Sequence, residues 1–146
     1  MYKRILVPLD GSKRAEAILP HVEEIALNFH SKLIFMQMVE MPPMMMGSEA
    51  PYLEGFQMEM EEVAKQAELY LETVSGEFRE KGMQSKTIIS HGPVVDGIIN
   101  TAESESADLI AMASHGRTGL SKVFYGSVAA GIMHRIDRPL LIVRSA

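Results

Sequence analysis

Small residues and a hydroxyl group follow one apolar run of this chain, in a pattern that suits anion binding. The run is Ala107–Ala113, "ADLIAMA", and Gly116, Gly126 and Ser127 come after it. The first N–H groups of a helix lack internal acceptors, and the helix dipole adds partial positive charge there. Glycine lets such amides approach a phosphate oxygen closely. The stretch therefore suggests a phosphate-binding loop that leads into a helix starting at Ser127.

The residues of this loop leave two interpretations open. Arg117 and Lys122 can screen a polyphosphate, and Ser127 can cap the helix and donate its hydroxyl to a phosphate oxygen. Alternatively, Gly116 is only a turn residue and Gly126-Ser127 is only an N-cap. The loop matches neither G-x-x-x-x-G-K-S/T nor G-x-G-x-x-G, so neither of these phosphate signatures decides between the two.

The elements that must position this loop alternate along the chain. Apolar residues recur three and four apart between short apolar runs, which predicts helices between strands. The expected strands are residues 4–9, 32–39, 85–90, 107–113 and 139–144. The expected helices are residues 15–29, 56–78, 94–102 and 127–136. The first of these helices contains Pro20, which predicts a kink.

This alternation predicts an α/β fold in a single domain that spans residues 1–146. We expect a doubly wound, five-stranded parallel sheet with helices on both faces, flavodoxin-like or Rossmann-like. The strand order 2-1-3-4-5 and its relatives are the candidates. Between the second strand and second helix, Met41–Gly55 predicts an irregular loop, because its three prolines exclude regular structure. Its three consecutive methionines form either an adaptable contact surface or a floppy loop.

Polar residues follow the first and fourth expected strands, where ligands bind in sheets of this kind. The first strand ends in "PLDGS" and the fourth in "MASHG". Asp10 either faces a ligand at this edge or is a turn carboxylate that caps the first helix. His115 either touches a phosphate or hydrogen-bonds to a neighbour. No nucleophile, base and acid can be assembled from the sequence into a catalytic group.

Composition narrows the class of protein. The formal net charge of −5 argues against general nucleic-acid binding, which requires a basic face. The chain has no cysteine, so it can form neither a disulfide nor a thiolate metal site. It shows no signal peptide and no apolar stretch long enough to span a membrane. We therefore expect a cytoplasmic protein.

The spacing of the loop resembles a family motif. Ala113, Gly116 and Gly126-Ser127 are separated by two and nine residues, which is similar to the G-x2-G-x9-G-S/T motif in the ATP-binding branch of the universal stress protein family. The opening "ILVPLDGS" and the segment from Ser90 to Val143 resemble the same family, so the likeness covers the whole chain. Ala113 departs from the motif, which has its first glycine there.

The resemblance implies a fold similar to that of the adenine nucleotide alpha hydrolases and a site for ATP, with Mg²⁺ or Mn²⁺. Asp10 would face the base and ribose or a bound metal ion, and Met38 would offer its backbone to the adenine edge. Backbone amides at Gly126, Ser127 and Val128 would surround the triphosphate. With Arg117 of the loop included, the candidate nucleotide contacts are Pro8, Leu9, Asp10, Met38, Met112, Ala113, Gly116, Arg117, Gly126, Ser127 and Val128.

The function expected from this resemblance is nucleotide-dependent regulation in the stress response, by a homodimer that forms through Leu140–Arg144. An apolar strand at a sheet edge invites such pairing. Two alternatives stay open. One is a slow ATPase or phosphoryl-transfer enzyme, for which Asp10 and His115 are the only candidate groups. The other is a dimeric interaction module that binds no nucleotide, which Ala113 favours slightly.

Overall fold

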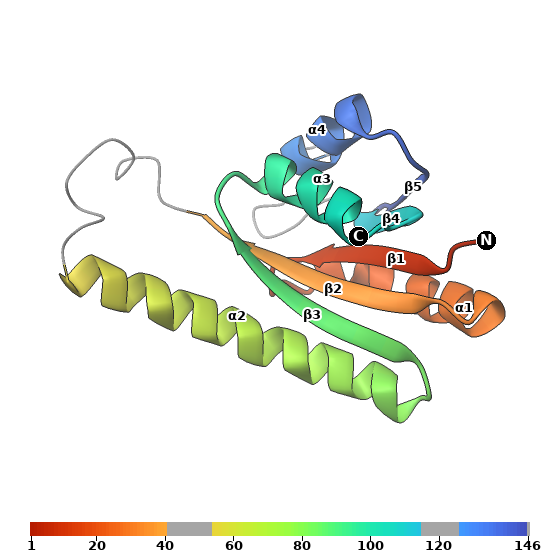
Figure 1. Cartoon of the computed structure of the whole chain (residues 1–146), viewed down its shortest axis with the longest axis horizontal. Coiled ribbons are helices and arrows are strands. Elements are labelled where there is room, and N and C mark those ends of the chain that lie inside the picture. The colour runs from red at the N-terminus through yellow and green to blue at the C-terminus, as the bar shows by residue number, and fades with distance from the viewer. Residues whose placement is uncertain (41–53, 115–125, 146) are drawn as a thin grey trace.

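The computed structural model describes residues 1–40, 54–114 and 126–145 of the 146-residue chain. These residues form one five-stranded parallel sheet in the order β3-β2-β1-β4-β5 (Figure 1). The strands are β1 (Arg4–Leu9), β2 (Lys32–Val39), β3 (Gln84–His91), β4 (Leu109–Ala113) and β5 (Leu140–Val143). The predicted doubly wound α/β class is confirmed.

The order 2-1-3-4-5 was wrong, and its relative 3-2-1-4-5 forms instead. The observed order leaves β3 at one edge of the sheet and β2 inside it. Their burial explains the difference, because nearly every residue of β2 is buried whereas those of β3 are at most half-buried. A strand rich in serine, lysine and threonine suits an edge, where one side meets solvent.

Helices cover both faces of the sheet (Figure 1). The short 3-10 helix η1 (Ala15–Ile18), α1 (Leu19–Phe29) and α2 (Glu54–Glu80) lie on one face. On the other face lie α3 (Val94–Ser104) and α4 (Ser127–Arg135). None of the helices within the described ranges is long and apolar enough to cross a membrane.

The strands are apolar on both sides because each side meets a helix layer. In β1, Ile5 and Val7 pack towards α1 and α2, whereas Leu6 packs towards α3 and α4. Phe35 of β2 belongs to the first cluster and lies against Phe78 of α2, with ring centroids 5.1 Å apart. Burial of each such side chain stabilises the folded state by about 1.5–3 kcal/mol relative to leaving it in water. Burial on both sides therefore places β1 and β2 inside the sheet rather than at its edges.

Two predicted boundaries were wrong for local reasons. The first helical segment is not one kinked helix, because η1 ends at Ile18 and Pro20 lies in the first turn of α1. Proline is well suited to that turn, since the N–H it lacks would have no acceptor there. The expected loop Met41–Gly55 is also too long, because α2 already includes Glu54 and Gly55. Residues 41–53 lie outside the described part.

His91 is the last residue of β3. The other elements agree with the prediction to within one or two residues at each end, and β2 and β1 have the predicted bounds. α2 ends at Glu80, and Gly82 just after it has a φ of +88°, which favours glycine.

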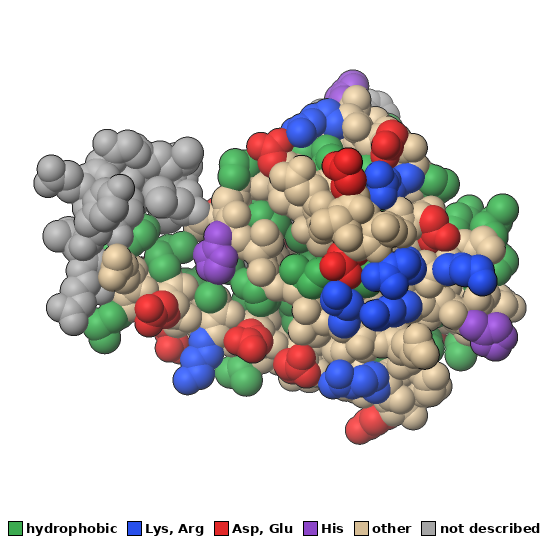
Figure 2. All heavy atoms as spheres, viewed as in Figure 1, with side chains coloured by type: hydrophobic (Ala, Val, Ile, Leu, Met, Phe, Trp, Pro, Cys, Tyr) green, Lys and Arg blue, Asp and Glu red, His purple; other side chains and the backbone are tan. Residues whose placement is uncertain are grey.

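Charged side chains tie the amino ends of the strands together. The carboxylate of Asp108, just before β4, accepts hydrogen bonds from the N–H groups of Lys3 (2.9 Å) and Arg4 (3.1 Å). Glu105 pairs with Lys86 of β3 at 2.7 Å and with Arg4 at 3.3 Å. The hydrogen bond from Lys86, aided by the charge of Arg4, lowers the pKa of Glu105. Figure 2 shows Lys and Arg side chains gathered on this face of the molecule.

A glycine lets the two helices on the second face approach closely. Gly131 is in the middle of α4, and a Cβ atom there would lie 2.8 Å from Cγ2 of Val95 in α3. Carbon atoms in folded proteins do not approach to that distance, so α3 and α4 can pack this way only with glycine at this position. The contact therefore sets the position of α4, whose first turn borders the candidate site.

We predict that Gly131→Ala destabilises the protein by about 1–3 kcal/mol, because the added methyl group forces α3 and α4 apart. Gly76→Ala is the matched control, since Gly76 lies inside α2 and a Cβ there has no neighbour within 4 Å. That variant should be more stable by about 0.5–1 kcal/mol, the usual gain of alanine over glycine in a helix. Urea unfolding followed by circular dichroism measures both. A stabilised Gly131→Ala protein would contradict the close approach.

Candidate functional site

β1 and β4 stop pairing well before either strand ends. Their register includes only Ile5 with Leu109 and Leu6 with Ile110. Beyond this point β1 continues to Leu9 beside β2, and β4 continues to Ala113 beside β5. The helices that follow the two strands lie on opposite faces. This is the switch point of the sheet, the position where open α/β sheets bind ligands.

A carboxylate closes the turn after β1. Oδ1 of Asp10 accepts hydrogen bonds from the N–H of Ser12 (2.9 Å) and from its hydroxyl (2.6 Å). The Ser12 hydroxyl oxygen in turn accepts the N–H of Ala15, at the start of η1 (3.2 Å). Gly11 between them has a φ of +86°. The predicted turn role of Asp10 is confirmed, and Ser12 rather than Asp10 caps the helical segment.

Ser114 joins three elements at the end of β4. Its N–H donates to the carbonyl of Val143 in β5 (2.7 Å), and its own carbonyl accepts the N–H of Gly126 (2.7 Å). Its hydroxyl oxygen accepts the N–H of Ser145 (3.2 Å). Ser114 is 2% exposed. The sequence analysis did not predict a role for Ser114. The available signal was a serine directly after the buried strand, in "MASHG".

The first turn of α4 differs from the prediction at one residue. Gly126 is the N-cap, with φ −63° and ψ 161°, and it has no side chain with which to cap the helix. The prediction that Ser127 caps α4 was therefore wrong, because Ser127 is already the first helical residue. The first bond inside the helix runs from the N–H of Ala130 to the carbonyl of Gly126 (3.0 Å). The amides of Ser127 and Val128 precede it and have no acceptor within the helix.

The candidate nucleotide contacts at this edge of the sheet differ in how accessible they are to a ligand, and some lie outside the described residues. Met112 is buried in the core between the sheet and the second helix layer, so only its backbone groups can meet a ligand, and Val128 packs partly buried against that core. Ala113 ends β4 directly before Ser114. Gly116 and Arg117, like His115 and Lys122, lie outside the described residues.

The residues expected on the nucleoside side lie at the ends of β1 and β2. Pro8 and Leu9 end β1, past the last pair with β4, and Pro8 has no N–H with which to extend that pairing. β2 continues past its last pair with β1, so Met38 lies beyond the end of β1. The side chain of Met38 turns away and packs where a Cβ on Gly97 of α3 would lie. Only the Met38 backbone is therefore suited to a ligand.

The described residues contain no group of three or more His, Asp or Glu side chains that could hold a metal ion. Asp10 is thus the one predicted metal-facing carboxylate within the described ranges, and a single carboxylate does not make a protein cage. A cation at this site would need most of its ligands from elsewhere, as Mg²⁺ does when it binds with phosphates.

A half-buried phenol joins α2 to the segment that follows β1. The hydroxyl of Tyr70 donates to Oε2 of Glu16 in η1 (2.7 Å), and Lys13 pairs with the same carboxylate at 3.6 Å. Burial raises the pKa of Tyr70 well above its usual value. The hydrogen bond to Glu16 and the negative charges of Glu16 and Asp10 raise it further. α2 is therefore held near the turn that contains Asp10.

We predict that Tyr70→Phe lowers the free energy of unfolding by about 1 kcal/mol at pH 8, through loss of this hydrogen bond. The native pKa lies above the unfolded value of about 10, so the contribution is complete below that pH and declines as pH rises through it. The difference between wild type and variant should therefore shrink above about pH 10. Urea unfolding at several pH values measures it, with Tyr2→Phe as control. A difference that grows with pH would contradict this assignment.

Comparison with known proteins places the whole chain in one family. The universal stress protein family matches residues 1–144. Universal stress protein MJ0577 of Methanocaldococcus jannaschii is 28% identical over 155 residues, which cover 99% of this chain and 96% of the relative. Universal stress protein Sll1654 of Synechocystis sp. is 31% identical over 143 residues, which cover 98% of this chain and 86% of the relative.

Solved structures agree with this result. The MJ0577 structure matches with a TM-score of 0.87 at 29% identity, over 100% of this chain and 98% of that one. The universal stress protein UspA from Lactobacillus plantarum matches with a TM-score of 0.81 at 21% identity, over 98% of both chains, which bears on the fold. On the family match over residues 1–144 and these relatives, the chain belongs to the universal stress protein family.

Proposed function

We propose that this protein binds ATP at the switch point and acts as a nucleotide-dependent regulatory protein in the stress response. The observation that carries the proposal is the hydrogen bond from the Gly126 N–H to the Ser114 carbonyl (2.7 Å). It anchors the first turn of α4 to the end of β4, beside the position where β1 and β4 separate. Amides without acceptors inside the helix then border the ligand-binding edge of the sheet.

The phosphates are assigned to the first turn of α4. The amides of Ser127 and Val128 have no acceptor within the helix, and the helix dipole makes this end partly positive. Gly126 adds no side chain that would block the approach of a phosphate. Gly116 and Arg117 of the preceding loop complete the proposed phosphate contacts.

The nucleoside is assigned to the ends of β1 and β2. β2 continues past the last residue of β1, which leaves its backbone at Met38 without a β1 partner. The proposal gives the edge of the adenine ring to this backbone, and the sugar to Asp10 and to the chain at Pro8 and Leu9. Mg²⁺ or Mn²⁺ would be held by the phosphates together with Asp10, and would offset the negative charge of the triphosphate.

Relatives of the same fold support adenine nucleotides as the first ligands to test. One universal stress protein was solved in complex with cAMP and matches this chain with a TM-score of 0.61 at 24% identity. The universal stress protein from Archaeoglobus fulgidus was solved in complex with dAMP and matches with a TM-score of 0.64 at 17% identity. Those ligands belong to those proteins, and at this identity the likeness to this chain is one of fold.

Regulation requires that the nucleotide distinguishes two states of the protein. A ligand shifts a conformational equilibrium only by the difference in its affinity for the two states. The first turn of α4 can supply such a difference, because Ser114 connects it to β4, to β5 and to Ser145 near the C-terminus. Binding at the first turn of α4 can therefore change the edge of the sheet where a partner would dock.

We predict that Gly126→Val lowers the affinity for ATP by about tenfold or more, because the side chain occupies the approach of the phosphates to the amides. Gly126 has a φ of −63°, so valine is not excluded by backbone strain. Isothermal titration with MgATP measures the effect, after denaturation of the purified protein and chromatography have shown which nucleotide it carries.

Two controls separate lost binding from lost folding. Gly76→Ala should bind ATP as tightly as wild type, since Gly76 lies in α2 away from the site. Gly126→Ser keeps a favoured N-cap residue with a smaller side chain, and should bind with intermediate affinity. Equal affinity in Gly126→Val and wild type would show that the phosphates bind elsewhere. No binding of ATP to wild type would remove the proposed function.

We further propose that the protein forms a homodimer through the strand at Leu140–Arg144. β5 is an edge strand whose four residues, all apolar, are half-buried in the single chain. The carbonyl of Pro139 accepts a hydrogen bond from Ile110 of β4 (3.0 Å), and that of Val143 accepts one from Ser114, directly after β4 (2.7 Å). Backbone groups alternate in direction along a parallel strand, so those of Ile142 point away from β4. They are suited to pair with a second copy.

We predict that Ile142→Pro converts the dimer into a monomer in analytical ultracentrifugation. Proline removes the outward N–H of Ile142, whereas the bonds that β5 makes to β4 involve other residues. Circular dichroism and thermal unfolding would show whether the variant keeps its fold. A folded Ile142→Pro protein that remains dimeric would show that β5 is not the interface, and a monomeric wild type would overturn the dimer.

A further inference from the structure

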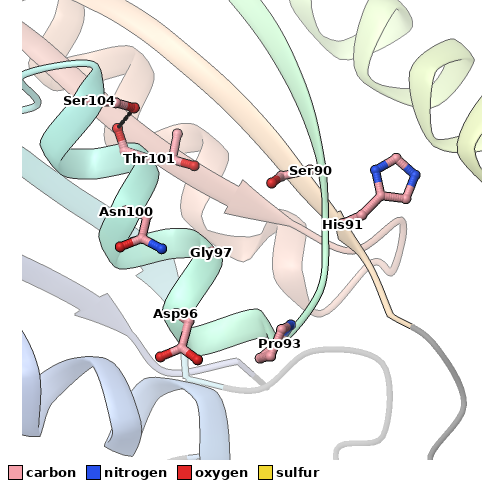
Figure 3. A pocket seen from close by; sticks show the side chains of 8 residues that line it. All are labelled: Ser90, His91, Pro93, Asp96, Gly97, Asn100, Thr101 and Ser104. Atoms are coloured by element: carbon pink, nitrogen blue, oxygen red, sulfur yellow. Dashed lines mark hydrogen bonds between the residues drawn. The ribbon is translucent and has the colours of Figure 1, made fainter. Parts of the chain in front are cut away.

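A pocket lies between α3 and the edge strand β3, apart from the residues assigned to the nucleotide. Its volume is about 350 Å³, at the lower end of the range for small-molecule sites. Figure 3 shows the side chains around it. The residues that line it are Ser90, His91, Pro93, Asp96, Gly97, Asn100, Thr101 and Ser104.

One hydroxyl that faces this pocket makes no hydrogen bond within the described residues. Thr101 is 8% exposed, and among the described residues its hydroxyl makes no hydrogen bond, although its carbonyl accepts one from Ser104. Figure 3 shows the hydroxyls of Thr101 and Ser90 turned towards the space between α3 and β3. A hydroxyl that faces an open pocket and makes no bond within the described chain is available to donate to and accept from a ligand.

The charges around the pocket define the class of ligand. None of the lining residues is Lys or Arg, so the pocket offers nothing to balance a phosphate or carboxylate. The Asp96 carboxylate at its rim pairs with Arg135 of α4 at 2.5 Å. The remaining polar groups are neutral, and the hydroxyls of Ser90 and Thr101 and the amide of Asn100 can all donate and accept.

We propose that this pocket binds a small, uncharged, polyhydroxylated molecule of about monosaccharide size. Hydroxyl groups of such a molecule can accept from and donate to Ser90, Asn100 and Thr101 at once, which a purely apolar or anionic ligand cannot do. His91 also lines the pocket, but Figure 3 shows its ring turned away from the side chains of Ser90 and Thr101. The proposal does not depend on ATP binding, since no residue of the switch point lines the pocket.

The test is a titration of the full, isotopically labelled chain with D-glucose, D-ribose and glycerol, followed by two-dimensional NMR. At least one of the three should shift the amide signals of Ser90, Asn100 and Thr101 in a saturable manner. Glucose 6-phosphate is the charged comparison, and it should bind more weakly than glucose because no cation lines the pocket. If none of the three neutral compounds shifts these signals, or if the phosphate binds more tightly, the proposal is wrong.

Thr101→Val is the decisive variant, because it removes the hydroxyl and keeps the shape of the side chain. The free protein should lose no stability, since that hydroxyl makes no hydrogen bond within the described residues. Affinity for the sugar should fall by about tenfold, which corresponds to one lost hydrogen bond. Thr73→Val, on the exposed side of α2, is the control and should bind like wild type. Unchanged affinity in Thr101→Val would overturn the assignment, and a destabilised variant would show that the hydroxyl serves the fold instead.

Discussion

Ser114 is the residue on which the arrangement of the candidate site depends. Its N–H bonds to β5, its carbonyl bonds to the N-cap of α4, and its hydroxyl bonds to the backbone after β5. All three bonds are buried or half-buried, so breaking one leaves a polar group unsatisfied, which costs more than the bond itself contributes. The carbonyl bond holds the first turn of α4 at the carboxyl end of β4.

The two faces of the sheet make different contributions to this site. On one face, the turn of Asp10, Ser12 and η1 is joined to α2 through Tyr70 and Glu16. On the other, Gly131 allows α4 to lie against α3. The switch point lies where these two halves meet, which is why a ligand there would contact both. A nucleotide at this position therefore has a physical route to change how the two halves pack, as regulation requires.

The Asp10 side chain can both stabilise the turn after β1 and contact a ligand. One of its oxygens accepts two hydrogen bonds from Ser12, which fixes the direction of the carboxylate before any ligand arrives. A side chain fixed by its neighbours loses little conformational freedom on binding. The turn role and the proposed ligand role are therefore compatible. The pocket at Thr101 differs, because the hydroxyl that faces it makes no hydrogen bond within the described part of the chain.

Local patterns in the sequence determined the strands and helices, since burial on one or both sides imposes a period on the apolar residues. They also determined the turn at Asp10 and the helix start near Gly126-Ser127, because glycine and short polar side chains act on their immediate neighbours. The resemblance of the loop spacing identified the family. Tertiary structure alone decided the strand order, the role of Ser114 and the pocket between α3 and β3. Each of these depends on which distant segments pair. That pairing is stabilised by contacts between residues far apart in the chain, and the local spacing of apolar residues carries no information about them.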